Sequence, residues 1–390
     1  MTFPERFSNL PPYAFPRLRS LLAGLEPGGV PVDMTIGSPQ HAFPEWISEI
    51  ISKNAAGFGG YPPNDGAPEL RAAIAAWIGR RYDVSVDFET QILALNGTRE
   101  GLFNAAVALS PEEKNGKPVV LMPNPFYQVY AVASLTAGAE PVYVPATFET
   151  GYLPDFAGLP EDVLNRTTVA YLCSPSNPQG AVATLEYWQD LLALADKYDF
   201  KIFADECYSE IYRTMAPTGA LTASKGHDPE RVVLFNSLSK RSNLAGLRSG
   251  FAASGPENMK RLKALRAYAG APLSLPLQRA AEQVWADEDH VEANRALYRE
   301  KLDFSDTVFG DVAGYKSPEA GFFLWLPVKD GEEATKELWT SAGVKVLPGA
   351  YLGRDYMGSN PGTKYIRVAL VAPMNELQPG LTRLKSCIYG

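Results

Sequence analysis

Short apolar runs alternate with helix-like segments between about residues 46 and 275 of this 390-residue chain. This alternation restricts the fold strongly, because it is typical of an α/β domain built around a largely parallel sheet. Strands of such a sheet are buried on both faces and are therefore apolar along most of their length. Seven runs have the length and composition expected of these strands: 91–95, 118–122, 141–145, 168–173, 200–204, 231–236 and 246–253.

The pattern changes after about residue 280. A helical stretch over 280–308 is followed by short β-rich segments at 321–327, 343–348 and 365–370. We therefore expect a second, smaller α+β domain in this part of the chain. Residues 1–45 contain many prolines and few periodic stretches, and we expect them to wrap over another part of the molecule.

The overall composition argues against several classes of protein. A net charge of -8 disfavours a nucleic-acid-binding surface, which needs a basic face. The three cysteines and three histidines show no metal-type spacing and predict neither a metal site nor a disulfide framework. No apolar run approaches the length of a membrane span, and the N-terminus lacks the pattern of a secretory signal. We expect a cytoplasmic protein that binds neither nucleic acid nor membrane.

One lysine stands among small hydroxyl side chains in segment 237–250, which directly follows the sixth apolar run. Desolvation and a nearby cation would lower the pKa of Lys240, and a neutral lysine amine can attack an aldehyde. Ser237, Ser239 and Arg248 supply hydroxyl and guanidinium donors that suit a phosphate. An aldehyde and a phosphate on one small molecule indicate pyridoxal 5'-phosphate (PLP). The alternative is an exposed lysine in a serine-rich loop, without any chemical role.

Two further strand ends carry polar residues that suit the same cofactor. Asp205 follows run 200–204, where a carboxylate is poorly solvated and needs a cationic partner such as a protonated pyridine nitrogen. Tyr208 is three residues further on and could reach the opposite side of the ring. Asn177 follows run 168–173 and could donate to a phenolate oxygen, although an asparagine before proline is commonly a turn residue.

Three other positions have both a functional and an ordinary interpretation. Gly97 and Thr98 open a helix whose free N–H groups could bind phosphate, or Thr98 is simply the helix cap. Tyr127 lies in a proline-rich loop and could stack on a planar ring, or it belongs to the core. Arg367 lies in a predicted strand and either faces solvent or binds a carboxylate.

Taken in their order along the chain, these residues resemble the motifs of the class I/II aminotransferases of PLP fold type I, and the resemblance covers nearly the whole chain. The resemblance implies an α/β fold, with a large domain around a mostly parallel seven-stranded sheet and a smaller α+β domain. It assigns 46–279 to the large PLP-binding domain, and 1–45 together with 280–390 to the small domain. It also implies amino acid and keto acid substrates and a homodimer with shared active sites.

The resemblance further implies a role for each matching residue. Lys240 would bind the cofactor's aldehyde and transfer protons, while Asp205 would pair with the pyridine nitrogen. Asn177 and Tyr208 would hold the ring oxygen. The other positions would contribute as follows: Tyr127 to ring stacking; Gly97, Thr98, Ser237, Ser239 and Arg248 to phosphate binding; Tyr61 from the neighbouring subunit; and Gly37, Asn177 and Arg367 to substrate binding.

Five segments are similar to bacterial succinyldiaminopimelate aminotransferases: 12–22, 124–130, 205–212, 237–243 and 360–362. This narrower resemblance implies transamination between glutamate or 2-oxoglutarate and N-succinyl-LL-2,6-diaminopimelate, in lysine and diaminopimelate synthesis. The alternatives are an aminotransferase for aspartate, alanine or aromatic amino acids, a PLP-dependent β-lyase, or a non-catalytic protein that kept the fold.

A succinylated substrate carries several negative charges, so its binding cleft needs cations beyond Arg367. We expect some of four basic residues to supply them: Arg17, Arg19, Lys316 and Arg354. For Arg17 and Arg19, a solvated helix face is an equally good interpretation.

Overall fold

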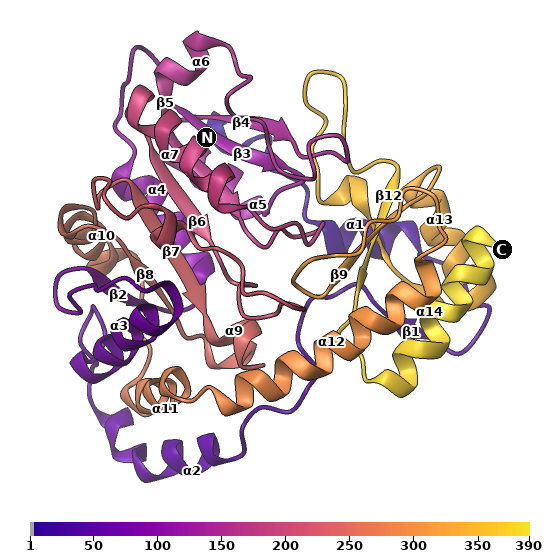
Figure 1. Ribbon diagram of the computed structural model, residues 1–390, viewed down its shortest axis with the longest axis horizontal. Coiled ribbons are helices and arrows are strands. Elements are labelled where there is room, and N and C mark those ends of the chain that lie inside the picture. Colours follow the sequence, from indigo (N-terminus) through magenta and orange to yellow (C-terminus); the bar gives the residue numbers. More distant parts are fainter. Residues whose placement is uncertain (1–3) are drawn as a thin grey trace.

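The computed structural model describes residues 4–390, and its largest feature is a seven-stranded sheet (Figure 1). The strand order is β2-β8-β7-β6-β5-β3-β4. The strands are β2 (Ile92–Leu95), β3 (Val119–Asn124), β4 (Glu140–Pro145), β5 (Thr167–Cys173), β6 (Lys201–Asp205), β7 (Val232–Ser237) and β8 (Gly250–Ala253). All seven predicted strands are present. The last begins at Gly250 instead of residue 246, because Ala245–Leu247 form a short 3-10 helix, η3.

The sheet is mostly parallel, as predicted. Strands β3 to β7 run parallel to one another, and only β8 is antiparallel to its neighbours β2 and β7. Every residue of β2, β3, β5 and β7 is buried, which requires helices on both faces. The predicted α/β fold is therefore confirmed.

Helices cover the two faces of the sheet in two separate apolar clusters (Figure 1). Leu234 of β7 packs in a cluster with α3, α7 and α11, and its neighbour Val233 packs in a cluster with α4, α5 and α10. Successive strand residues point to opposite faces, so both faces need apolar side chains. These helices are α3 (Pro68–Tyr82), α4 (Thr98–Leu109), α5 (Gln128–Thr136), α7 (Leu185–Tyr198), α10 (Pro256–Ala269) and α11 (Leu275–Ala286).

A three-stranded antiparallel sheet lies beside the large one, in the order β11-β12-β9. These strands are β9 (Phe323–Pro327), β11 (Leu347–Pro348) and β12 (Tyr365–Ala369). Helices α13 (Gly331–Glu337) and α14 (Met374–Tyr389) belong to the same region, and α12 (Asp289–Phe309) crosses to it from the large sheet (Figure 1).

The N-terminal part of the chain joins this C-terminal region. Strand β1 (Val32–Asp33) pairs in parallel with β10 (Val344–Lys345), and α1 (Ala14–Leu21) packs against β11. Met34 lies in the same apolar cluster as residues of β9, β12 and α14. The domain boundaries expected near residues 45 and 280 stay a prediction.

The predicted helical stretch over 280–308 consists of two helices, because the helical backbone is interrupted between the end of α11 and the start of α12. Asp287 has an extended backbone, and its carboxylate accepts a hydrogen bond from the His290 N–H at 3.2 Å. Aspartate in this arrangement favours a helix start over helix continuation.

The remaining elements are short: α2 (Trp46–Lys53), α6 (Glu161–Arg166), α8 (Ala220–Ala223), α9 (Leu238–Arg241), η1 (Glu5–Phe7), η2 (Ala55–Gly59), η4 (Leu338–Ala342) and η5 (Gly349–Tyr351). Within residues 4–390, none of the helices combines the length and the apolar character that crossing a bilayer requires.

Candidate active site

A cavity of about 360 Å³ lies where the carboxyl ends of β5, β6 and β7 meet the small sheet. Ligands of open α/β sheets bind at this edge, outside the carboxyl ends of the strands. Eleven of the predicted site residues line the cavity: Gly37, Thr98, Tyr127, Asn177, Asp205, Tyr208, Ser237, Ser239, Lys240, Arg248 and Arg367. Of the other two, Gly97 directly precedes Thr98, and Tyr61 lies outside the lining.

Lys240 lies on the single-turn helix α9, directly after β7. Its Nζ donates a hydrogen bond to the carbonyl of Gly37 and lies 5.5 Å from the centre of the Phe322 ring. Burial lowers the pKa of Lys240 to about 8, and the positive charges of Arg367 and Arg248 act in the same direction. The amine is therefore partly neutral near neutral pH, as a nucleophile or base requires.

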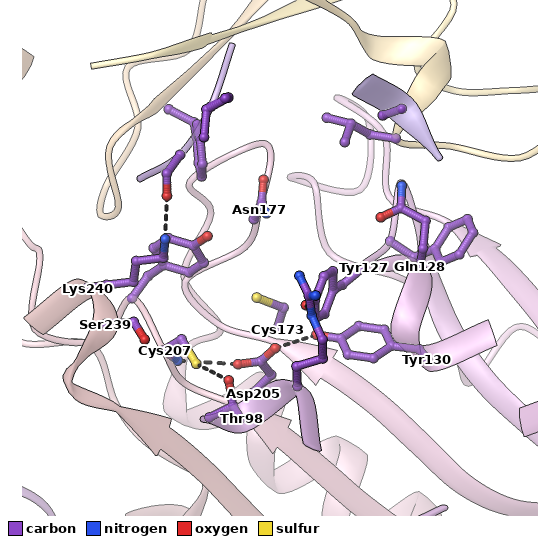
Figure 2. A pocket seen from close by; sticks show the side chains of 18 of the residues that line it. Thr98, Tyr127, Gln128, Tyr130, Cys173, Asn177, Asp205, Cys207, Ser239 and Lys240 are labelled. Carbon is purple, nitrogen blue, oxygen red and sulfur yellow. Dashed lines mark hydrogen bonds between the residues drawn. The ribbon is translucent and has the colours of Figure 1, made fainter. Parts of the chain in front are cut away.

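Asp205 ends β6 at the floor of the cavity. Its Oδ2 accepts a hydrogen bond from the Tyr130 hydroxyl at 2.7 Å, drawn as a dashed line in Figure 2. Burial raises the pKa of Asp205, while the hydrogen bond from Tyr130 opposes this effect. Asp205 forms no ion pair with another side chain of residues 4–390, so a cation in the cavity would stabilise its charged form.

One end of the cavity is suited to an anion. Thr98 is the first residue of α4, whose free N–H groups and dipole attract negative charge. Gly97 has φ +85°, and a Cβ there would lie 2.3 Å from Arg248 Nη2. Glycine therefore allows the Arg248 guanidinium to lie against this turn. Ser237 and Ser239 add hydroxyl groups to the same lining.

A second cationic group comes from β12. Arg367 is buried, and it donates to the Thr35 carbonyl at 2.7 Å and to Asn177 Oδ1 at 3.0 Å. Its Nε has no hydrogen-bond partner within the described residues. Burial lowers the pKa of Arg367 to about 10. Because this cation has no carboxylate partner, a substrate carboxylate would satisfy it.

The two rings expected near the cofactor also line the cavity. Tyr127 accepts a hydrogen bond from Arg99 Nε at 2.8 Å and lies edge-on to Tyr130. Tyr208 lies edge-on to Phe322 and Phe323 of the small-sheet region. The two tyrosines follow two different strands of the large sheet, β3 and β6.

Sequence reasoning misses Arg99 and Tyr130, which also line the cavity. Arg99 follows Thr98 in the first turn of α4, so its position next to a predicted phosphate site was the available signal. Tyr130 lies in the first turn of α5, three residues after the N-cap residue Tyr127, and the centres of the two rings are 5.7 Å apart. Its ring stacks on Tyr171 at 4.3 Å.

The four basic residues expected to bind a succinyl group lie outside the cavity lining. Arg17 covers the Tyr351 ring at 3.7 Å and pairs with Glu332 at 3.6 Å. Lys316 and Arg354 belong to loops, and Arg19 is exposed on α1. Sequence spacing could not show this, because the position of each group depends on how the two sheets are packed together.

Comparisons with known proteins agree with this geometry. A family model described as aminotransferase class I and II matches residues 31–384. An LL-diaminopimelate aminotransferase of Dehalococcoides mccartyi is 32% identical, over 98% of this chain and 98% of that protein. Another from Desulforudis audaxviator is 32% identical, over 100% of this chain and 99% of that protein.

Similar solved structures are also aminotransferases. An aminotransferase from Neisseria meningitidis has a TM-score of 0.93 and 38% identity, with 98% of this chain and 99% of that chain covered. The aminotransferase AspB from Helicobacter pylori has a TM-score of 0.89 and 33% identity, with 99% of each chain covered.

The predicted N-succinyl substrate is wrong, because the curated relatives are named LL-diaminopimelate aminotransferases, without a succinyl group. Segments 205–212 and 237–243, on which that prediction partly rests, lie at the ends of β6 and β7 on the cavity floor. A local likeness at strand ends reflects a shared fold and does not by itself distinguish one substrate from another. The match over residues 31–384 shows that the chain belongs to the class I and II aminotransferases, a family of PLP-dependent enzymes.

Proposed function

We propose that this aminotransferase acts on LL-2,6-diaminopimelate, with 2-oxoglutarate as the amino acceptor. The observation that carries the proposal is the presence of Arg367 and Arg99 in one cavity with Lys240. Neither arginine forms an ion pair with a carboxylate of residues 4–390, so both remain available to a substrate with two carboxylates. The names of the curated relatives support the same class of substrate.

The residues of the cavity fit PLP. Asp205 offers a buried carboxylate that lacks a cation, Lys240 offers an amine, and the turn at Gly97 leaves room for Arg248 beside an anion. These groups complement a pyridine nitrogen, an aldehyde and a phosphate respectively. When bound, PLP withdraws electrons from the α-carbon of the substrate and makes its proton removable.

Each residue then has a defined task. Asp205 holds the ring nitrogen protonated, and Asn177 and Tyr208 hold the ring oxygen. Tyr127 packs on the ring. The phosphate is held by the backbone of Gly97 and Thr98 and by the side chains of Ser237, Ser239 and Arg248.

Lys240 moves the proton at the substrate's α-carbon. A pKa of about 8 leaves part of the amine neutral at neutral pH, so Nζ can accept a proton and return it. Arg367 binds the α-carboxylate and fixes the α-carbon relative to Lys240. Gly37 lines the same pocket without a side chain, and a Cβ there would lie 2.4 Å from Phe323.

We also propose that the enzyme is a homodimer in which Tyr61 reaches the partner's cavity. Tyr61 is fully exposed in the single chain, and Phe58 and Tyr268 are also exposed. Burial of these three rings against a partner would remove apolar surface from water. The cytoplasmic location stays a prediction.

The test is a coupled assay of glutamate formation from 2-oxoglutarate and LL-diaminopimelate, with PLP present. We expect turnover by the wild-type protein and none by Lys240→Ala, because no other amine replaces Lys240 at this position. Aspartate, alanine and aromatic amino acids serve as competing donors. Faster turnover with one of these donors would contradict the proposed substrate, and residual turnover in Lys240→Ala would exclude Lys240 as the base.

A further inference from the structure

A buried polar network lies beside the cavity and takes no part in the proposed chemistry. It consists of Asn294 and Lys301 from α12 and His41 from the segment between β1 and α2. Asn294 is 5% exposed and Lys301 is 1% exposed. Polar groups so deeply buried must make hydrogen bonds, so their partners show what the network holds together.

Asn294 joins three segments with one amide group. Its Oδ1 accepts hydrogen bonds from His41 Nδ1 at 2.9 Å and from Asn243 Nδ2 at 3.0 Å. Its Nδ2 donates to the carbonyl oxygens of Lys240 at 3.4 Å and Arg241 at 3.3 Å. The side chain of Asn294 therefore connects the backbone at the reactive lysine with the segment that contains Gly37.

His41 and Lys301 extend the network toward β12. Because His41 Nδ1 donates to Asn294, its Nε2 is the acceptor for Lys301 Nζ, which lies 2.6 Å away. Lys301 also donates to the carbonyl of Val371 at 3.2 Å, two residues after the end of β12. It forms no ion pair with a carboxylate in the described part of the chain, and burial lowers the pKa of Lys301 to about 8.

A row of aromatic rings links the same network to the side chain of Lys240. The His41 ring lies 4.6 Å from that of Tyr298, and Tyr298 stacks on Phe322 at 5.2 Å. Lys240 Nζ lies 5.5 Å from the Phe322 ring and donates to the Gly37 carbonyl. The backbone of Lys240 is thus held by Asn294. The side chain of Lys240 contacts the Gly37 carbonyl and the Phe322 ring, and the His41 ring contacts Phe322 through Tyr298.

We propose that Asn294, His41 and Lys301 are positioning residues, which keep the Gly37 segment, Lys240 and the end of β12 in a fixed arrangement. This inference rests on the proposed function, because it concerns the distance between the base and the bound substrate. A buried cation without a carboxylate partner adds little stability, since its desolvation is costly. The hydrogen bonds of Lys301 to His41 and Val371 instead fix the position of the Gly37 segment relative to the end of β12.

Loss of the network should affect catalysis in two distinguishable ways. Asn294→Ala releases the backbone at Lys240, so we expect kcat to fall by about tenfold or more, because proton transfer depends on sub-ångström alignment. His41→Phe releases the Gly37 segment that lines the substrate pocket, so we expect mainly a rise of KM for the amino acid by about tenfold. His41→Asn keeps a donor near the position of Nδ1 and should restore part of the loss.

The matched control is Asn258→Ala. Asn258 lies on α10, outside the cavity lining, is 3% exposed, and donates hydrogen bonds to the Glu230 carbonyl and to Ser254 Oγ. Its loss should lower stability without a selective change in kcat or KM. The second measurement is amide hydrogen exchange of residues 36–43 in the PLP-loaded protein. We expect faster exchange there in Asn294→Ala and His41→Phe but not in Asn258→Ala.

The two readouts separate the possible failures. If Asn294→Ala and His41→Phe behave like Asn258→Ala in both kinetics and exchange, the positioning role is wrong. If Asn294→Ala does not fold, the His41 pair alone decides the question. If the wild-type protein forms no glutamate from diaminopimelate, the proposed function fails, while hydrogen exchange still tests whether the network holds residues 36–43.

Discussion

Burial gives Lys240 its chemical character. An exposed lysine has a pKa near 10.5 and is almost entirely charged at neutral pH, whereas burial lowers the pKa of Lys240 to about 8. The nearby positive charges of Arg367 and Arg248 act in the same direction, and no carboxylate forms an ion pair with Lys240 within residues 4–390. The same environment that makes the amine reactive therefore lowers the stability of the protein without its cofactor.

This cost predicts a pH-dependent stability difference between cofactor-free wild type and Lys240→Met. The unfolded chain keeps the proton of Lys240 up to about pH 10.5, whereas the folded chain loses it near pH 8. The unfolded state thus binds more protons between these values, and wild-type stability rises with pH there. We expect Lys240→Met to be more stable by at most about 3 kcal/mol below pH 8, and the gain to vanish above pH 10.5. Urea unfolding at several pH values measures this, and a gain independent of pH would contradict it.

Arg99 predicts a preference for substrates with two carboxylates. A charge-assisted hydrogen bond contributes about 1.5–3 kcal/mol, so Arg99→Met should lower kcat/KM for diaminopimelate by about tenfold to a hundredfold. Lysine lacks the second carboxylate, and its slower turnover should change little. Arg17→Met is the control, because Arg17 lies outside the cavity lining. An equal loss for diaminopimelate and lysine would show that Arg99 does not bind the distal carboxylate.

At the scale of elements, the turn from β2 into α4 illustrates how local backbone geometry builds a binding site. Gly97 takes a positive φ, which glycine adopts without steric cost, and brings the start of α4 against Arg248. Arg248 in turn donates to the carbonyls of Asn96 and Ala245. Two segments far apart in sequence therefore meet at the anion-binding end of the cavity.

Gly97→Ala should weaken PLP binding more than it weakens the fold. The added Cβ would lie 2.3 Å from Arg248 Nη2 and displace that guanidinium. We expect the PLP dissociation constant to rise by about tenfold or more, as for a lost charge-assisted hydrogen bond. Gly246→Ala is the control, because nothing lies within 4 Å of the added Cβ and its φ is ordinary. Titration with PLP, followed by absorbance, compares the two, and equal affinities would remove Gly97 from the phosphate site.

At the scale of the whole molecule, the cavity of one chain lacks the ring of Tyr61, which is fully exposed. If Tyr61 enters the partner's cavity, Tyr61→Ala and Lys240→Ala subunits should complement each other. When equal amounts of the two variants are mixed at random, half of the dimers contain one subunit of each, and one of the two sites in such a dimer carries both native residues. We expect about a quarter of the activity of the same amount of wild-type protein. Activity no higher than the sum of the separate variants would place Tyr61 outside the partner's site.

Much of this architecture could be predicted from the chain alone. Apolar runs define all seven strands of the large sheet, because a strand buried on both faces cannot contain many polar residues. Lys240, Asp205 and Asn177 could be predicted because each lies within four residues of the end of such a run, and strand ends meet at one edge of the sheet. Their order along the chain then matches the order in the family that the sequence resembles.

Other features were decided only when the elements packed together. Whether Arg99 or Arg17 faces the cavity depends on how α4 and α1 lie against the two sheets, and no local pattern records that. The same is true of Asn294, His41 and Lys301, which are remote in sequence and ordinary by themselves. Apolar periodicity and turn chemistry act between near neighbours and can be seen in the sequence. Contacts across long sequence distances arise from the shared geometry of layers, so only the tertiary structure shows them.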